Sequence, residues 1–141
     1  MIDFQNLYRQ VIMDNYKNPK NKGLVETADY INIHLKNPSC GDDMYISLKK
    51  DNDKVIDIRH DGHGCSICCS SASVSSELLK GKTIEEATSI INRFYEMVKG
   101  NEIENEDDLE EALAYKTVAS FPARIKCATL SWKAIEEALK Q

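Results

Sequence analysis

The hexapeptide Asn37-Pro38-Ser39-Cys40-Gly41-Asp42 lies between two runs in which apolar and polar residues alternate. Proline fixes one backbone angle and glycine reaches conformations closed to other residues, so the pair favours a tight turn between two strands. The turn carries a thiol, Cys40, and a carboxylate, Asp42, separated by one residue. Both groups are common metal ligands, which makes this turn the first candidate for a functional site.

Alternating segments on either side of the turn predict a small sheet. Strands are predicted over 30–36, 43–49 and 54–61. In the third strand we expect Ile56 and Ile58 to share the buried face, and Asp51-Asn52-Asp53 predicts a hairpin turn before it. An antiparallel sheet with a single apolar face needs helices to cover that face.

Helical periodicity marks most of the remaining chain. An amphipathic helix is predicted over 3–17, with Asp3 as its N-cap, and its leucine and tyrosine positions are expected to contact the core. Further helices are predicted over about 65–80, 83–100 and 122–139. Thr83 and Glu86 have the spacing of a capping box. Seven of the eleven residues over 101–111 are acidic, which predicts a solvated loop leading into a short helix.

The predicted fold class is therefore α+β, with a three-stranded antiparallel sheet covered by helices on one face. A length of 141 residues and an apolar fraction of 42% favour a single folded domain over 1–141. The net charge of −5 argues against nucleic acid or an acidic membrane as a partner. No apolar run approaches the roughly 20 residues that span a bilayer. Residues 1–4 lack the features of a secretory signal, so we expect a cytoplasmic location.

Five cysteines in a cytoplasmic chain indicate metal or thiol chemistry rather than disulfides. Cys65 follows a glycine turn at the start of a predicted helix, and Cys127 lies in the first turns of the last one. Turns at one end of a sheet and helix N-termini packed on that end can converge. Cys40, Asp42, Cys65 and Cys127 would then supply the closed set of ligands that tetrahedral Zn²⁺ prefers. Helix N-termini near two of the thiols would help to stabilise thiolate charge.

Several segments also match a known family in their order along the chain. They are residues 7–14 (LYRQVIMD), 18–23 (NPKNKG), 37–42 (NPSCGD), 62–67 (GHGCSI) and 124–132 (RIKCATLSW). Together they resemble the SufU proteins of the IscU-like iron–sulfur cluster assembly superfamily. The resemblance implies an IscU/SufU-like domain over nearly the whole chain. It also implies the same zinc ligands, namely Cys40, Asp42, Cys65 and Cys127.

The resemblance further implies a sulfurtransferase that works as a sulfur relay and not as a stand-alone catalyst. Its partner would be a SufS-type, pyridoxal-phosphate-dependent cysteine desulfurase that carries a persulfide on its own cysteine. A desulfurase side chain would take one zinc position and free Cys40 to attack the outer persulfide sulfur. The sulfur would then pass to a cluster scaffold complex or to a reductant. The alternative is an IscU-type scaffold that assembles a [2Fe–2S] cluster on the same cysteines.

Features around the last cysteine favour the SufU interpretation. The interval from Cys65 to Cys127 is longer than in IscU proteins, and Lys126 stands where IscU proteins have a histidine. The Leu-Pro-Pro-Val-Lys motif of IscU proteins is replaced by SFPAR over 120–124. These differences favour zinc-dependent sulfur transfer over cluster assembly.

Other polar groups leave alternatives open. Cys68 and Cys69 depart from the family pattern; Cys68 is an alternative ligand or a redox partner of Cys65, although two buried helix residues are the simpler interpretation. His63 could replace Asp42 as a ligand, but a histidine in a turn more often faces solvent. Arg124 could orient Asp42 or stabilise a persulfide, and a surface ion pair is the plain alternative. His34 and His60 are expected at polar strand positions or strand ends, without a separate role.

Overall fold

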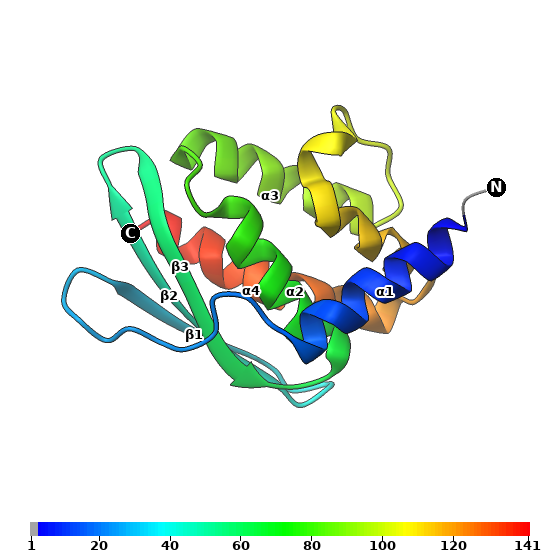
Figure 1. Ribbon diagram of the computed structural model, residues 1–141, viewed down its shortest axis with the longest axis horizontal. Coiled ribbons are helices and arrows are strands. Elements are labelled where there is room, and N and C mark those ends of the chain that lie inside the picture. The colour runs from blue at the N-terminus through cyan, green and yellow to red at the C-terminus, as the bar shows by residue number, and fades with distance from the viewer. Residues whose placement is uncertain (1–2) are drawn as a thin grey trace.

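The computed structural model describes residues 3–141 (Figure 1). Met1 and Ile2, on which the prediction of no secretory signal partly rests, lie outside the described residues. The elements follow in the order α1 (Phe4–Lys17), β1 (Ile31–Asn37), β2 (Asp42–Asp51), β3 (Lys54–His63), α2 (Ser66–Leu79), α3 (Ile84–Val98), the 3₁₀ helix η1 (Glu106–Ser120) and α4 (Pro122–Leu139).

The strands form an antiparallel sheet in the order β1-β2-β3. In Figure 1 the sheet lies on one side of the molecule and the helices on the other. Helix α4 packs on β1 and β2, and α2 packs on β3, while α1, α3 and η1 surround these two helices. The predicted α+β fold, with helices on one face of a three-stranded antiparallel sheet, is confirmed.

The core lies between the sheet and the helices. The central strand β2 buries Met44, Ile46 and Leu48 on its inward face, as the alternating pattern predicts. Opposite the sheet, Phe94 of α3 stacks on Trp132 of α4 with ring centroids 3.8 Å apart. Aromatic side chains bury large apolar areas, so this pair anchors the two helices to each other.

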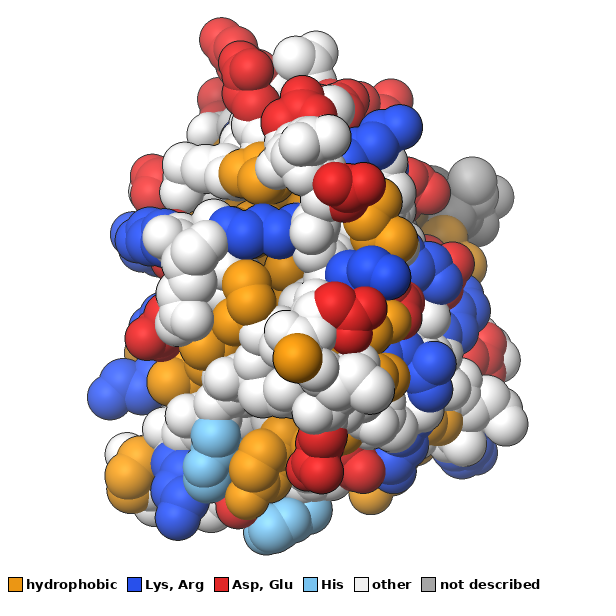
Figure 2. Space-filling view, turned by 90° about the vertical axis from the view of Figure 1, so that its left-hand side faces the viewer, with side chains coloured by type: hydrophobic (Ala, Val, Ile, Leu, Met, Phe, Trp, Pro, Cys, Tyr) orange, Lys and Arg blue, Asp and Glu red, His pale blue; other side chains and the backbone are white. Residues whose placement is uncertain are grey.

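The other face of the sheet carries polar and charged side chains. The His34 ring stacks on Tyr45 of the neighbouring strand with centroids 4.0 Å apart, and His34 Nε2 contacts Asp43 Oδ1. Figure 2 shows the sheet side of the molecule, where histidine, basic and acidic side chains are exposed together. The backbone N–H of Val25 donates to Ser47 Oγ at 3.2 Å, so the segment before β1 covers part of this face.

A β-bulge changes the alternation in β3. The pairing register shifts between Lys49 and Lys50 of β2, and Ile56 is the extra residue opposite this step. Val55 and Ile58 are buried, whereas Ile56 is 43% exposed. The prediction that Ile56 and Ile58 share the buried face is therefore wrong, because one inserted residue reverses the alternation beyond it.

Helix α1 begins where the sequence predicts, but its apolar side is only partly buried. Asp3 Oδ1 accepts from the backbone N–H groups of Gln5 and Asn6, as expected of an N-cap. Leu7 is 49% exposed and Tyr16 is 44% exposed, so their predicted core contacts are wrong. Helix α1 packs along α2 and η1 at the edge of the molecule, where only part of an apolar stripe can be covered.

Helix α2 is a serine-rich helix buried inside the fold. Ser71 Oγ donates to the backbone oxygen of Ala128 at 2.6 Å and accepts from Trp132 Nε1 at 2.8 Å. Ser75 and Ser131 form a second hydrogen bond between the same helices at 3.2 Å. Small hydroxyl side chains allow α2 and α4 to approach closely while their polar atoms stay paired. The helices that begin near Cys65 and contain Cys127 are thereby fixed to each other.

The structure of the segment around α3 largely agrees with the predictions from the sequence. The capping box is present, since Thr83 Oγ1 accepts from Glu86 N and Glu86 Oε1 accepts from Thr83 N. The acidic segment is loop until Glu106, where η1 begins. This 3₁₀ helix is kinked at Glu110, whose φ is +47°. Among the described residues, no helix has the length and apolar character needed to cross a membrane.

Candidate metal centre

The β1–β2 turn presents the first two candidate ligands. The backbone N–H of Cys40 donates to the carbonyl oxygen of Asn37 at 3.2 Å, which closes the turn. Gly41 has φ +72°, a left-handed conformation that suits glycine. The result is a half-buried Cys40 followed by Asp42, which is only 2% exposed at the start of β2. The predicted tight turn is present.

Asp42 also contacts the start of α2. The backbone N–H of Cys65, the N-cap residue of this helix, donates to Asp42 Oδ1 at 3.0 Å. The preceding residue has to be glycine, because a Cβ atom at Gly64 would lie 2.3 Å from the same carboxylate oxygen. The glycine turn after β3 therefore allows the carboxylate and the helix N-terminus to meet.

Helix α4 brings a further thiol to this carboxylate. The ligand atoms of Cys40, Asp42 and Cys127 all lie within 4.8 Å of one another. The Cys65 thiol is not part of this cluster of three, but the backbone N–H of Cys65 donates to Asp42 Oδ1, which places this residue at the border of the cluster. Burial, followed by the proximity of Asp42, Cys40 and Cys65, raises the pKa of the Cys127 thiol. The structure thus brings three of the predicted ligands together and places the backbone of the fourth, Cys65, against Asp42.

The donor set fits a thiophilic dication. A buried carboxylate next to thiols is costly unless a positive charge or hydrogen bonds compensate for it. Within residues 3–141, no lysine, arginine or histidine forms an ion pair with Asp42, and its hydrogen-bond donors are Cys65 N and Asn37 Nδ2. Cysteine thiolates and aspartate carboxylates are both zinc ligands, and four of them can complete a tetrahedral site. These residues can therefore hold a zinc ion.

Arg124 supplies positive charge at the solvent side of the cluster. Its side chain is exposed, and interaction with Cys127 is the main cause of a raised pKa for its guanidinium. The charges of Cys65 and Cys40 raise this pKa further. A guanidinium near thiols favours their ionised forms.

The two cysteines that depart from the family pattern lie outside the cluster. Cys68 is fully buried in α2, and burial raises the pKa of its thiol. Cys69 is half-buried, and its Sγ lies 3.8 Å from the carbonyl oxygen of Gly64. The interpretation of Cys68 as a buried helix residue is confirmed, whereas Cys69 is only partly covered.

The histidines differ in how far they are exposed to solvent. His63 is exposed, as expected, but it is the last residue of β3 and does not lie in a turn. His60 is 4% exposed, and its Nε2 lies 2.7 Å from the carbonyl oxygen of Lys20. Burial lowers the pKa of the His60 imidazole. The expectation of a polar strand position is therefore wrong for His60, because the segment after α1 pairs with β3 and covers it.

Asn37 is a site residue that the sequence did not single out. It is the last residue of β1 and is 5% exposed. Its Nδ2 lies 3.3 Å from Asp42 Oδ2 and 3.8 Å from Cys127 Sγ. Its place before a proline predicts only a turn, and nothing in the local pattern predicts a contact with a residue 90 positions away.

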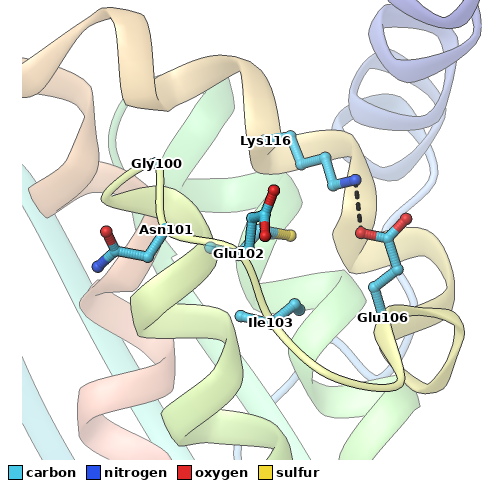
Figure 3. A pocket seen from close by; sticks show the side chains of 7 residues that line it. Gly100, Asn101, Glu102, Ile103, Glu106 and Lys116 are labelled. Carbon is cyan, nitrogen blue, oxygen red and sulfur yellow. Dashed lines mark hydrogen bonds and ion pairs between the residues drawn. The ribbon is translucent and has the colours of Figure 1, made fainter.

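A separate cavity of about 450 Å³ lies between the end of α3 and η1 (Figure 3). The loop residues Gly100, Asn101 and Glu102 border it, and Glu106 forms an ion pair with Lys116 at 2.7 Å. Its lining contains neither cysteine nor histidine. The thiol chemistry of this chain therefore belongs to the cluster between the β1–β2 turn and α4.

Comparisons with known proteins agree with this geometry. A family model described as the NifU-like N terminal domain matches residues 7–96. The chain is 48% identical over 135 residues to the zinc-dependent sulfurtransferase SufU of Bacillus subtilis (strain 168), with 96% of this chain and 90% of that protein covered. It is 40% identical over 136 residues to the iron–sulfur cluster assembly scaffold protein IscU of Streptococcus pyogenes serotype M1, covering 96% of this chain and 84% of that protein.

A solved structure shares the fold. It is a crystal structure of a proposed iron–sulfur cluster assembly scaffold protein for the SUF system (FiSufU) from Fervidobacterium islandicum AW-1. It matches with a TM-score of 0.86 and 36% identity, covering 92% of this chain and 94% of that one. The similarity to SufU extends over nearly the whole sequence, which confirms the resemblance seen in the motifs. The chain therefore belongs to the family of NifU-like N-terminal domains, among the SufU and IscU proteins of iron–sulfur cluster assembly.

Proposed function

We propose that this protein is a zinc-dependent sulfurtransferase for iron–sulfur cluster assembly, which accepts sulfur on Cys40 from the persulfide of a cysteine desulfurase. The observation that carries the proposal is the convergence of Cys40, Asp42 and Cys127 within 4.8 Å, around a buried carboxylate. The similarity to a protein named as a zinc-dependent sulfurtransferase supports the reaction class. We propose a SufS-type desulfurase as the donor and the cytoplasm as the location.

The proposed metal ligands are Cys40, Asp42, Cys65 and Cys127, with zinc as the metal. Zinc bound there would keep the thiols ionised and protect them from oxidation while no partner is present. A carboxylate is a harder ligand than a thiolate, so a mixed site should open more easily than an all-thiolate one.

Cys40 is the thiol best placed to leave this set and react. It is half-buried on a turn next to Gly41, whereas Cys127 is buried within α4 and Cys65 begins α2. The Cys40 thiolate would attack the outer sulfur of the desulfurase persulfide. A new S–S bond forms on Cys40, the old S–S bond breaks, and the desulfurase cysteine leaves as a thiolate, so no oxidant is required. Arg124, whose guanidinium pKa is raised by these cysteines, would stabilise the negative charge of the product persulfide.

Mass spectrometry tests this proposal directly. Wild-type protein is mixed with desulfurase and cysteine without reductant, and we expect one additional sulfur, about 32 daltons, on the peptide that contains Cys40. A Cys40→Ser variant is the matched control and should gain no such adduct. Equal persulfide on this variant would rule out Cys40 as the acceptor.

The competing function is assembly of a [2Fe–2S] cluster on the same cysteines. It is supported by the similarity to a protein named as an IscU scaffold. Iron and sulfide under anaerobic conditions would then give a coloured cluster that survives desalting and transfers to an acceptor protein. We expect instead that the protein purified without chelator contains about one zinc per chain, as a closed tetrahedral site predicts, and that bound iron is lost on desalting.

A further inference from the structure

Asn37 is a buried amide that lies between two of the candidate ligands. Its Nδ2 donates to Asp42 Oδ2 at 3.3 Å and to Cys127 Sγ at 3.8 Å. Its backbone carbonyl oxygen accepts from the N–H of Cys40 at 3.2 Å. With 5% of its surface exposed, this one residue contacts three of the four proposed ligands.

These contacts join parts of the chain that are distant in sequence. Cys40 and Asp42 belong to the turn after β1, whereas Cys127 belongs to α4. A carboxamide nitrogen carries two N–H bonds, so both side-chain contacts of Asn37 can exist at the same time. Its position therefore links the β1–β2 turn directly to the last helix.

The orientation of the carboxylate depends on the same amide. Asp42 Oδ1 accepts from the backbone N–H of Cys65, and Oδ2 accepts from Asn37. Each carboxylate oxygen thus has one donor and retains a lone pair for a metal. Without Asn37 the carboxylate would keep a single donor and could rotate about it.

We propose that Asn37 is a positioning residue of the metal centre, which slows the release of a bound dication and lowers the electron density on the Cys127 sulfur. The inference rests on the proposed function, because it takes the proposed ligands as the metal site. Hydrogen-bond partners of ligands orient them, and loss of one typically costs on the order of 10–100-fold in metal affinity. An N–H group directed at a thiolate stabilises its negative charge.

The test compares wild type with Asn37→Leu, which keeps a similar shape and removes the donors. Both proteins are titrated with Co²⁺, whose thiolate-to-metal charge-transfer band reports on the sulfur ligands. We expect the band of Asn37→Leu to move to longer wavelength, because the Cys127 sulfur loses its donor. Release of Zn²⁺ to a coloured chelator should be on the order of 10–100-fold faster.

Asn15→Leu is the matched control. Asn15 is also a buried amide, 4% exposed, and its hydrogen bonds go to Val11, Ser73 and Glu111, none of which is a proposed ligand. This variant should lose stability while keeping the wild-type charge-transfer band and release rate. A purely structural role for Asn37 would make the two variants alike.

The outcomes separate the inference from the proposed function. A wild-type protein that binds neither Co²⁺ nor Zn²⁺ overturns both. A wild type that binds metal, with an unchanged band and release rate in Asn37→Leu, overturns the role of Asn37 alone. If circular dichroism shows that Asn37→Leu is unfolded, Asn37→Ser, whose shorter side chain reaches neither acceptor, is measured in its place and decides by the same criteria.

Discussion

Gly64 shows how one missing side chain makes room for the site. A Cβ atom there would meet both the carboxylate and the backbone of Asp42, at 2.3 and 3.1 Å. Backbone cannot move aside cheaply, so the Asp42 carboxylate would be displaced from the N–H of Cys65. The spacing of cysteines does not reveal this requirement, which arises only when β2 and the start of α2 are brought together.

Gly64→Ala is therefore expected to reduce zinc content and to lower the free energy of unfolding by about 1–3 kcal/mol, the usual cost of an unpaired buried polar group. Metal analysis and urea unfolding measure the two effects. Gly81→Ala is the control, since its φ of +85° strains alanine but no atom lies within 4 Å of the new Cβ. Full zinc occupancy in Gly64→Ala would contradict the proposed contact.

The buried His60 gives the stability a pH dependence. Burial lowers its pKa in the folded protein, so between the folded and unfolded pKa values the unfolded chain binds more protons. The free energy of unfolding should consequently fall as the pH drops from 7 through the unfolded value of about 6.5. Urea unfolding at several pH values should show a smaller slope in His60→Gln, which keeps a donor for the Lys20 carbonyl. An unchanged slope would assign the pH dependence to other groups.

At the scale of elements, the packing of α2 on α4 decides where Cys65 and Cys127 lie. A serine-rich helix is usually predicted to be exposed to solvent. In α2, however, Ser71 and Ser75 form hydrogen bonds with α4. Both helices also pack on the sheet, so a shift of either would separate the thiols. The site therefore depends on hydrogen bonds of serines that are not metal ligands.

Ser71→Ala is expected to destabilise the protein by about 1–3 kcal/mol, because the buried Trp132 Nε1 loses its acceptor. Thermal or urea unfolding measures this loss. Ser89→Ala on the exposed side of α3 is the matched change and should stay within about 0.5 kcal/mol of wild type. Similar values for the two variants would contradict a role for Ser71 in helix packing.

Helix α1 allows an exposed apolar residue to be compared with a buried one on the same helix. Leu7 is half exposed while Ile12 on the same helix is 8% exposed. Leu7→Ser should therefore change the free energy of unfolding by no more than about 0.5–1 kcal/mol, against about 2–4 kcal/mol for Ile12→Ala. Urea unfolding of both variants checks this difference, and a larger cost for Leu7→Ser would mean that its side chain is buried in solution.

At the scale of the whole molecule, the size of the apolar core predicts that the chain folds without bound metal. Phe94, Tyr115 and Trp132 are fully buried, and they belong to α3, η1 and α4. A core of this kind can hold a chain of this length together without a cross-link. We propose that residues 1–141 form one cooperative unit and that zinc adds to its stability without creating it.

Removal of zinc by a chelator should thus leave the far-UV circular dichroism of the protein nearly unchanged and lower its Tm in a single transition. Binding to the native state alone stabilises by mass action, so adding zinc back should restore the Tm. Loss of the helical signal on metal removal would instead indicate a structural zinc protein. Two separate transitions would contradict the single-domain proposal.

The sequence by itself determined most of the elements and the candidate ligands. Strand alternation, the Asp3 and Thr83 caps and the glycine and proline turns are local signals, and each acts within a few residues. The metal-binding potential of Cys40, Asp42, Cys65 and Cys127 was equally visible, because thiolates and carboxylates bind metals wherever they converge.

Only the tertiary structure decided the rest. The bulge at Ile56, the exposure of Leu7, the burial of His60 and the contact of Asn37 with Cys127 all depend on which surfaces meet across long sequence intervals. Local periodicity carries no information about contacts between segments that are distant in sequence. Burial and polar pairing are properties of the packed chain, so they emerge only when sheet and helices come together.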